Sequence, residues 1–470
     1  FENKKKKKIR KEPIYIGICI LCLVIGTFGG YFYSSMTNKS QANESIDEYT
    51  QIKTIIEDAF VDTTDSQYSL KDRMLAGMVA GLGDRYTSFM TADQNKELQT
   101  SINGTFVGVG LSFTALNEGA LVLEVYKGTP ANKAKVQAGD IITHVQGTSI
   151  AGYDSDKVKN VIVGEAGTEV TLRVLRNGKS QEIKVSRENV DTSLSYEIRT
   201  SQQKKIGYIR LTTFGESTVE LFEKALQEFQ SQNVETLCID LRENSGGYLD
   251  AAKGILNLLI PQGGTLYKEQ QKDKDPVAIK AEKGNKYTFK NGYILANESS
   301  ASASEVTAAC LMDNLDYKLI GTKTFGKGLV QTQAVLKDSS ILKYTNAKWL
   351  TPKGECIQGK GITPTYEVKQ TLIEDFYYQA LEKSYQYDQV SEDIAYMQEK
   401  LKELGYSVDR TDGYFSKATV NALKAFEKAY GLQVNGSYDK NDAIILMSAL
   451  AHHIYQLEDK QYQKVLEQIK

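Results

Sequence analysis

The chain has 470 residues, of which 41% are hydrophobic and 25% are charged. This length exceeds what one hydrophobic core accommodates, so we expect several domains, and the composition is that of a globular protein. The net charge is −2, and because residues 1–12 are strongly basic, the remainder of the chain is clearly acidic. We therefore expect no nucleic-acid partner, since nucleic acids are bound through basic faces.

Cysteine and histidine, the residue types that most often bind zinc or form disulfides, are few and do not occur at the spacings of a metal site or a disulfide framework. The chain has five cysteines and three histidines, with no Cys/His pattern typical of a zinc site. Cys238 and Cys310 fall in apolar patterns, which favours buried free thiols over a disulfide framework. We expect neither a metal ion nor another cofactor.

A lysine-rich stretch at residues 4–11 precedes an uncharged, mostly apolar run at 13–33. About 20 apolar residues span a bilayer as a helix, and the positive flank stays in the cytoplasm. We therefore expect a cytoplasmic segment at 1–12, a single-pass transmembrane anchor at 13–33 in the cytoplasmic membrane, and an extracytoplasmic position for the rest. The alternative is a cleaved signal peptide, although no small-residue cleavage site directly follows the run.

Residues 34–100 are mostly polar with a helical period, because Ile52, Ile55, Ile56 and Phe60 recur on one face. We expect a helical N-terminal region that serves as a dimerisation arm, and hence a homodimer.

From about Asn103 the period changes to two, which predicts strands. A strand pattern at 105–113, a second strand, a short helix beginning at Pro130 and two further strand segments follow in order across 103–188. This order resembles a PDZ domain. The resemblance implies that backbone N–H groups of one loop bind the C-terminal carboxylate of a peptide that adds a strand to the sheet edge. That loop consists of Gly108, Val109, Gly110 and Leu111. A simple tight turn is the alternative interpretation of these glycines.

Residues 190–380 alternate strand, loop and helix, which implies an α/β core. Residues 390–452 resemble the three-helix peptidoglycan-binding module of cell-wall enzymes, so we expect peptidoglycan as a partner and residues 453–470 as a tail. Ordinary turn chemistry is the alternative for the Asp412-Gly413 pair in this module.

The α/β core contains the parts of a histidine-free acyl-transfer site. Ser302 lies among alanines at a strand-to-helix junction, where its hydroxyl is accessible, and Lys327 lies between two glycines. A serine hydroxyl becomes a nucleophile when a base takes its proton, and burial can keep a lysine neutral enough to do so. The expected oxyanion donors are the N–H of Ala303, at a helix N-terminus, and those of Gly246 and Gly247.

Each part alone also fits a turn or a helix start. The spacing from Gly321 to Lys327 nearly matches a phosphate-binding loop, but Gly328 stands where that motif needs Ser or Thr. A penicillin-binding type of acyl-serine enzyme is a second alternative, and its Ser-x-x-Lys motif occurs only in poor contexts.

Several motifs together resemble the carboxy-terminal processing, or tail-specific, proteases of peptidase family S41. The motifs are residues 240–247 (DLRENSGG), 300–305 (SASASE), 324–328 (TFGKG) with Gln331, 357–364 (IQGKGITP) and 82–89 (LGDRYTSF). The resemblance covers about residues 45–380.

The resemblance implies that Ser302 is the nucleophile, Lys327 the general base and Gln331 the residue that orients the lysine. It implies an α/β core of the crotonase/ClpP-like spiral type with an inserted PDZ domain, between an N-terminal helical arm and the C-terminal three-helix peptidoglycan-binding-like domain. The expected protein is a bacterial serine endopeptidase, anchored in the cell membrane, that cleaves proteins with apolar C-terminal tails. A catalytically inactive scaffold that binds tails and cell wall is the alternative.

The chain departs from the family pattern at Val163, where many relatives carry an arginine that couples the PDZ domain to the active site. Arg85 replaces a usual proline, and Thr365 a usual aspartate.

Overall fold

The structure is a computed structural model that describes residues 48–61, 66–370, 381–456 and 459–469. It divides into two compact units, Phe1–Gly81 and Leu82–Lys470. In the first unit, residues 48–59 and α2 (Leu70–Ala80) are helical. The second unit contains all of the elements described below.

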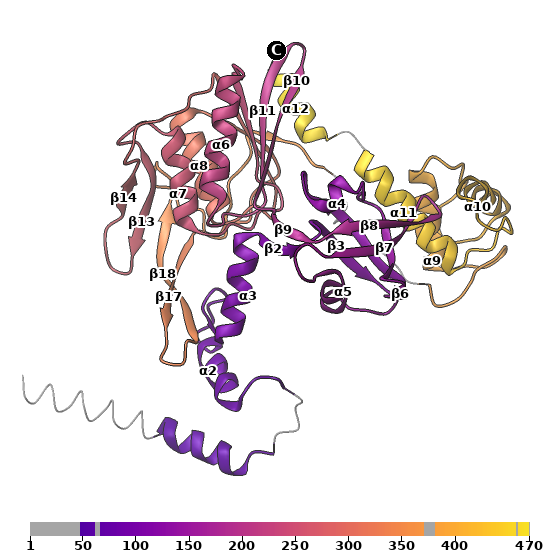
Figure 1. The fold of residues 1–470 in the computed structure, drawn as a ribbon, viewed down its shortest axis with the longest axis horizontal. Coiled ribbons are helices and arrows are strands. Elements are labelled where there is room, and N and C mark those ends of the chain that lie inside the picture. Colours follow the sequence, from indigo (N-terminus) through magenta and orange to yellow (C-terminus); the bar gives the residue numbers. More distant parts are fainter. Residues whose placement is uncertain (1–47, 62–65, 371–380, 457–458, 470) are drawn as a thin grey trace, which may run out of the picture. The chain divides into compact units, whose positions relative to one another are not determined.

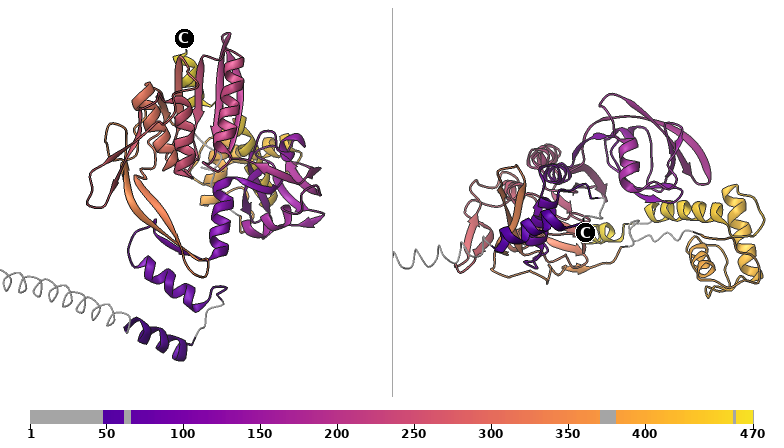
Figure 2. Two further views of the ribbon diagram at one scale, coloured as in Figure 1. Left: turned by 60° about the vertical axis from the view of Figure 1, so that its left-hand side comes forward. Right: turned by 90° about the horizontal axis from the view of Figure 1, so that it is seen from below.

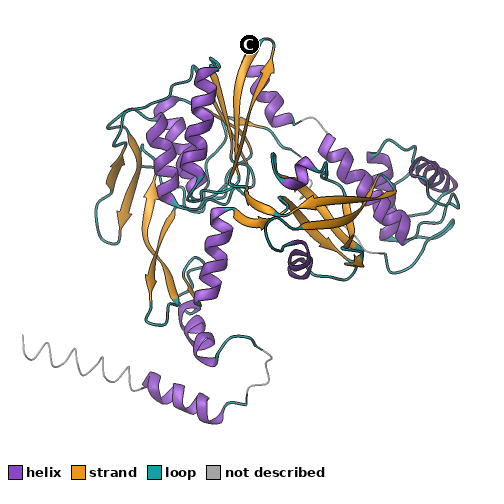
Figure 3. Cartoon of the chain, in the orientation of Figure 1, coloured by secondary structure: helices purple, strands orange, loops and turns teal. Residues whose placement is uncertain are grey.

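The core of the second unit is a six-stranded sheet in the order β10-β11-β12-β15-β16-β19 (Figures 1 and 3). β10 pairs with β11 antiparallel, and the remaining neighbours are parallel. All five residues of β12 are buried, as expected for a parallel strand covered on both faces. The strands are β10 (Leu194–Ser201), β11 (Lys204–Leu211), β12 (Thr236–Asp240), β15 (Asn291–Ala296), β16 (Lys318–Gly321) and β19 (Tyr366–Glu367).

Three helices pack against one face of this sheet. They are α6 (Thr218–Ser231), α7 (Leu249–Leu259) and α8 (Ala303–Leu315). Two of them, α6 and α7, are amphipathic, whereas α8 is buried along its first nine residues. Side chains such as Phe222, Ile255 and Leu311 form one buried cluster with Leu237 and Ile294 of the strands. Because each helix follows a parallel strand, the strand-to-helix loops gather at the carboxyl edge of the sheet.

A second, antiparallel sheet lies beside this core. Its strands are ordered β1-β18-β13-β14, and β17 also pairs with β18. The elements are β1 (Ser88–Met90), β13 (Thr265–Gln271), β14 (Val277–Lys280), β17 (Leu329–Val335) and β18 (Ile341–Leu350). The hairpin of β17 and β18 directly follows Lys327, so this sheet positions the lysine.

The segment resembling a PDZ domain forms a sheet in the order β3-β4-β5-β7-β8, with β6 (Thr148–Ser149) paired to β5. β3 lies at the edge of this sheet. The pair of β2 (Thr105–Gly108) and β9 (Glu188–Asp191) brings the start and the end of the domain together. α3 (Ala92–Asn103) precedes it. Its other elements are β3 (Leu111–Leu116), β4 (Gly119–Val125), α4 (Pro130–Lys133), β5 (Ile141–Val145), α5 (Ser155–Ile162), β7 (Glu169–Arg176) and β8 (Lys179–Ser186).

The C-terminal module contains α9 (Glu392–Glu403), α10 (Lys417–Tyr430) and α11 (Lys440–Gln456). It shares one buried cluster with the PDZ segment, in which Leu121 and Ile141 join Ile445 and Leu450. The backbones approach closely here, because a Cβ on Gly139 would lie 2.8 Å from the backbone nitrogen of His452. Figure 2 shows α11 beside the PDZ strands in both views. The last element is α12 (Lys460–Gln468).

The membrane location expected from the sequence requires correction. The expected anchor, residues 13–33, lies outside the described residues. Within the described ranges, no helix is both long enough and apolar enough to cross a membrane.

Candidate active site

Ser302 occupies the sharp turn between β15 and α8. Its backbone has φ 56° and ψ −114°, a conformation that residues with a side chain rarely adopt. Such strain persists only where the surroundings hold the residue in place, and it is found at exposed nucleophiles on strand-to-helix turns. Ser302 is half-buried, whereas its neighbours Ala301 and Ala303 are buried. The turn therefore presents the serine at the carboxyl edge of the sheet.

The neighbouring serines have structural roles. The hydroxyl of Ser300 donates to the Leu241 carbonyl oxygen at 2.8 Å, and that of Ser304 donates to the Asn244 carbonyl oxygen at 2.8 Å. Both serines are buried. Their bonds tie the Ser302 turn to the loop that follows β12.

The buried carboxylate of Glu305 joins the turn at Ser302 (the serine turn) to the loop between β16 and β17 that contains Lys327 (the lysine loop). Its Oε2 accepts the backbone N–H of Ser302 at 3.0 Å and that of Lys327 at 2.8 Å. Its Oε1 accepts the Thr324 hydroxyl at 2.6 Å and the Gly326 N–H at 2.7 Å. Glu305 is 0% exposed, so four donors compensate the burial of its charge. One oxygen atom thus holds the backbones of Ser302 and Lys327 side by side.

Lys327 is half-buried, and its ammonium is partly removed from water. This desolvation, together with the nearby charge of Lys343, lowers the pKa of Lys327, while Glu305 and Asp84 oppose the shift. Its carbonyl oxygen accepts the indole N–H of Trp349 at 2.8 Å. In the described residues, no hydrogen bond joins Ser302 Oγ to Lys327 Nζ. Catalytic hydrogen bonds are often long without substrate.

Gln331 lies on β17, four residues after Lys327. Its Nε2 is 3.5 Å from the Thr345 hydroxyl oxygen. That hydroxyl in turn donates a hydrogen bond to Asp84 Oδ2 at 2.6 Å. The structure therefore connects Gln331 to Asp84 and not directly to the lysine amine. Asp84 also contributes to the electrostatic environment of Lys327. The motif at 82–89 contained Asp84, but only the tertiary pairing of β1 with β18 reveals its place.

The three expected oxyanion donors differ in their availability. Gly246 packs directly against Ser302, since a Cβ on Gly246, with φ 110°, would lie 2.9 Å from Ser302 Cβ. Its N–H, however, donates to Asn244 Oδ1 at 2.9 Å. Among the contacts of the described residues, the N–H groups of Gly247 and Ala303 have no acceptor.

In the PDZ segment, the loop from Gly108 to Leu111 leads into the edge strand β3. The Val109 carbonyl oxygen accepts the Ala131 N–H at 2.8 Å, and the Gly110 carbonyl oxygen accepts the Tyr126 N–H at 3.1 Å. These bonds fix the carbonyl groups of the loop on the domain interior. The edge of β3 has no strand on its other side within the described part of the sheet.

Near Val163, an arginine comes from another part of the chain. Nε of Arg187 donates to the Ile162 carbonyl oxygen at 2.7 Å, at the end of α5, and its side chain packs against Gly164. The sequence pattern gave no indication of this contact, because Arg187 follows β8.

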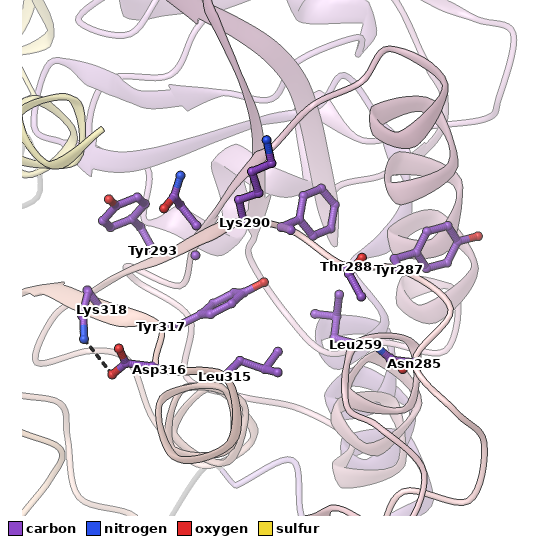
Figure 4. Close-up of a pocket in the computed structure, with 13 residues that line it drawn as sticks. Leu259, Asn285, Tyr287, Thr288, Lys290, Tyr293, Leu315, Asp316, Tyr317 and Lys318 are labelled. Carbon is purple, nitrogen blue, oxygen red and sulfur yellow. Dashed lines mark hydrogen bonds and ion pairs between the residues drawn. The ribbon is translucent and has the colours of Figure 1, made fainter. Parts of the chain in front are cut away.

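A cavity of about 280 Å³ lies away from these residues (Figure 4). Its walls include Lys290, Tyr293, Tyr317 and Lys318, at the amino ends of β15 and β16. Ser302 follows the opposite, carboxyl end of β15. No predicted site residue lines the cavity. Among the described residues, no group of three or more His, Cys, Asp or Glu is arranged to hold a metal ion.

Comparisons with known proteins identify the family. The model of peptidase family S41 matches residues 205–368, that of the PDZ domain 107–186, and that of a putative peptidoglycan binding domain 390–441. A probable CtpA-like serine protease of Staphylococcus epidermidis is 34% identical over 438 residues, covering 91% of this chain and 87% of that protein. A Staphylococcus aureus protein of the same name is 34% identical, with coverages of 91% and 86%.

Among solved structures, a photosystem II D1 C-terminal processing protease is 26% identical. The match covers 68% of this chain and 86% of that one, with a TM-score of 0.42.

The matched domains define a serine peptidase of the C-terminal processing type. The chain belongs to peptidase family S41, together with the CtpA-like serine proteases. The family resemblance found in the sequence is confirmed, as is the fold class of an α/β protease core with a PDZ domain and a C-terminal helical peptidoglycan-binding domain.

The Glu305 carboxylate generates the first prediction. We expect Glu305→Gln to lower peptidase activity by at least about a hundredfold, because displacement of catalytic groups by about 1 Å has that effect. The amide NH₂ would face backbone donors, so we also expect a loss of about 2–4 kcal/mol in the free energy of unfolding. Peptide hydrolysis and denaturant unfolding measure the two effects.

Glu298→Gln is the matched control, because Glu298 is exposed and its carboxylate accepts the Thr322 hydroxyl between the same two segments. Wild-type activity in Glu305→Gln would show that the carboxylate does not hold the site together.

Proposed function

We propose that this protein is a serine endopeptidase with a Ser302–Lys327 dyad. The observation that carries the proposal is the shared Glu305 oxygen, which holds both backbones at one place. The lowered pKa of Lys327 supports its role as the base, because a lysine must be neutral to accept a proton.

In the proposed reaction, Ser302 Oγ attacks the scissile carbonyl carbon while Lys327 Nζ takes the hydroxyl proton. The tetrahedral intermediate collapses to an acyl-enzyme, and the protonated lysine gives its proton to the leaving amine. Water then attacks the ester carbonyl carbon while Lys327 accepts its proton. The second tetrahedral intermediate collapses, the ester C–O bond breaks, and Lys327 returns the proton to Ser302 Oγ as the carboxylic product leaves.

The oxyanion donors in this proposal are the N–H groups of Ala303 and Gly247. Both are unoccupied among the described contacts, whereas the Gly246 N–H is held by Asn244. Gly246 instead gives the loop its close approach to Ser302. Gln331 orients Lys327 indirectly, since its side chain contacts Thr345 and, through it, Asp84.

Substitution of the nucleophile tests the dyad. We expect Ser302→Ala to abolish cleavage of an unfolded protein substrate, while Ser299→Ala, in the same serine run, retains it. Gel analysis of substrate decay measures both. If Ser302→Ala degrades the substrate as fast as the wild-type protein, the proposed dyad is wrong; loss of cleavage excludes an inactive scaffold.

The pH dependence provides a separate test of the lysine base. Activity should rise with pH as Lys327 loses its proton, and it should level off above the lowered pKa of Lys327. The Lys343 charge contributes to the lowering, so Lys343→Gln should raise the pKa and shift the rising limb of kcat to higher pH. Lys348→Gln, an exposed change on the same strand, should not shift it. An unshifted limb in Lys343→Gln would contradict the assignment.

We further infer that the PDZ domain binds substrate tails. The edge position of β3 supports addition of a peptide strand, and the loop of Gly108, Val109, Gly110 and Leu111 begins that strand. The backbone N–H groups of this loop are the proposed ligands of the terminal carboxylate, and apolar side chains of the tail would pack beside β3.

Chemical removal of the terminal charge tests tail recognition. A peptide with an apolar C-terminus should bind the Ser302→Ala protein at least about tenfold more tightly than the same peptide with a terminal amide, because charge-assisted hydrogen bonds contribute about 1.5–3 kcal/mol. Calorimetric titration compares them. Equal affinities would exclude carboxylate recognition.

The C-terminal module suggests peptidoglycan as a partner, since residues 390–441 match a putative peptidoglycan binding domain. The homodimer expected from the helical N-terminal region stays a prediction.

A further inference from the structure

The segment beyond the peptidoglycan-binding module packs on the protease core. α12 covers the face of the six-stranded sheet opposite to α6, α7 and α8 (Figure 1). Its side chains Tyr462 and Val465 are buried in one cluster with Tyr208, Cys238 and Leu295 of the strands. The C-terminal segment is therefore a part of the protease fold, although the module lies between the two in the sequence.

The N-cap residue of α12, Asp459, forms an ion pair with a buried arginine of the core. Arg242 Nη1 donates to Asp459 Oδ1 at 3.0 Å, and Nη2 donates to Asp459 Oδ2 at 2.8 Å. On its other side, Arg242 Nε donates to Asp240 Oδ1 at 2.8 Å and Nη2 to Asp240 Oδ2 at 2.5 Å. Arg242 is 7% exposed. The guanidinium thus lies between two carboxylates that each bind it with two hydrogen bonds, an arrangement that fixes its orientation.

Arg242 begins the loop that shapes the active site. The next residue, Glu243, has φ 59° and therefore adopts a left-handed backbone conformation, which turns the chain directly after the arginine. The Asn244 carbonyl oxygen then accepts the Ala301 N–H at 3.0 Å, next to the nucleophile. Gly246 packs against Ser302, and Gly247 is the proposed oxyanion donor. A shift of the arginine would move the loop against the serine turn.

We propose that Asp459 is a positioning residue of the peptidase, which acts through Arg242 on the loop from Glu243 to Gly247. The proposal rests on the proposed function. The C-terminal segment thereby completes a site whose reacting groups all lie more than a hundred residues earlier in the chain.

The variant Asp459→Asn separates the ion pair from the folding of α12. The Asp459 side chain also accepts the Tyr462 N–H at 3.0 Å as the N-cap of α12. Asparagine is as good an N-cap as aspartate, so the helix keeps its start while the negative charge is lost. We expect kcat to fall about tenfold, the ratio that corresponds to a lost charged hydrogen bond, with KM within about twofold of the wild type. Asp459→Glu, which restores the charge, should recover a part of kcat.

Val465→Ala is the control for a purely structural effect. It removes buried side-chain volume from α12 without touching Arg242, so it should lower Tm and leave kcat unchanged at a temperature well below Tm. Wild-type kcat in Asp459→Asn would overturn the proposal, and so would a loss of kcat equal to that in Val465→Ala. A change in KM alone, or failure of Asp459→Glu to recover kcat, would also overturn it.

Labelling of Ser302 by a fluorophosphonate distinguishes failure of the Asp459 proposal from failure of the proposed function. If the wild-type protein is not labelled at Ser302, the proposed dyad is wrong and the inference fails with it. If Ser302 is labelled at the same rate in the wild type and in Asp459→Asn, only the role of Asp459 is excluded. Slower labelling in Asp459→Asn, with wild-type rates in Val465→Ala, supports the proposal.

Discussion

The buried carboxylate of Glu305 is the interaction on which the site depends. It lies in the first turn of α8 and accepts four hydrogen bonds. Three come from the loop between β16 and β17, at Thr324, Gly326 and Lys327, and the fourth comes from the Ser302 N–H. A charge buried in this way is stable only when every donor is in place, so the serine turn and the lysine loop are fixed together or not at all. The bond from the Ser302 N–H also stabilises the unusual backbone conformation of Ser302.

Around this carboxylate, the two sheets have separate tasks. The parallel sheet delivers the loops after β12 and β15 to one edge, where Gly246 meets Ser302. The antiparallel sheet holds the lysine loop through the Trp349 indole and the β17–β18 hairpin. The PDZ segment and the C-terminal module share a buried cluster. Beyond that module, α12 returns to the protease core and buries Tyr462 and Val465 against its sheet.

Sequence motifs were sufficient to predict the family, the domain types and the α/β alternation, because these depend on local residue patterns. They could not distinguish Gly246 from Gly247 as a donor, since that depends on where the Asn244 side chain points. The sequence contained Glu305 within a motif but gave no reason for it, because three of its four donors lie about twenty residues away. No sequence pattern predicted the contact of Asp459 with Arg242, because the two residues lie 217 positions apart in the chain. The expected membrane location was wrong for the described residues.

The central claim is that one carboxylate holds a serine and a lysine in position for acyl transfer. A crystal structure of the fluorophosphonate adduct tests it most directly. The account predicts a covalent bond at Ser302 Oγ and a phosphoryl oxygen about 3 Å from the N–H groups of Ala303 and Gly247. It also predicts Lys327 Nζ within hydrogen-bond reach of Ser302 Oγ, with the Glu305 contacts intact. Modification of a different serine, or a Lys327 amine directed away from the adduct, would contradict the account.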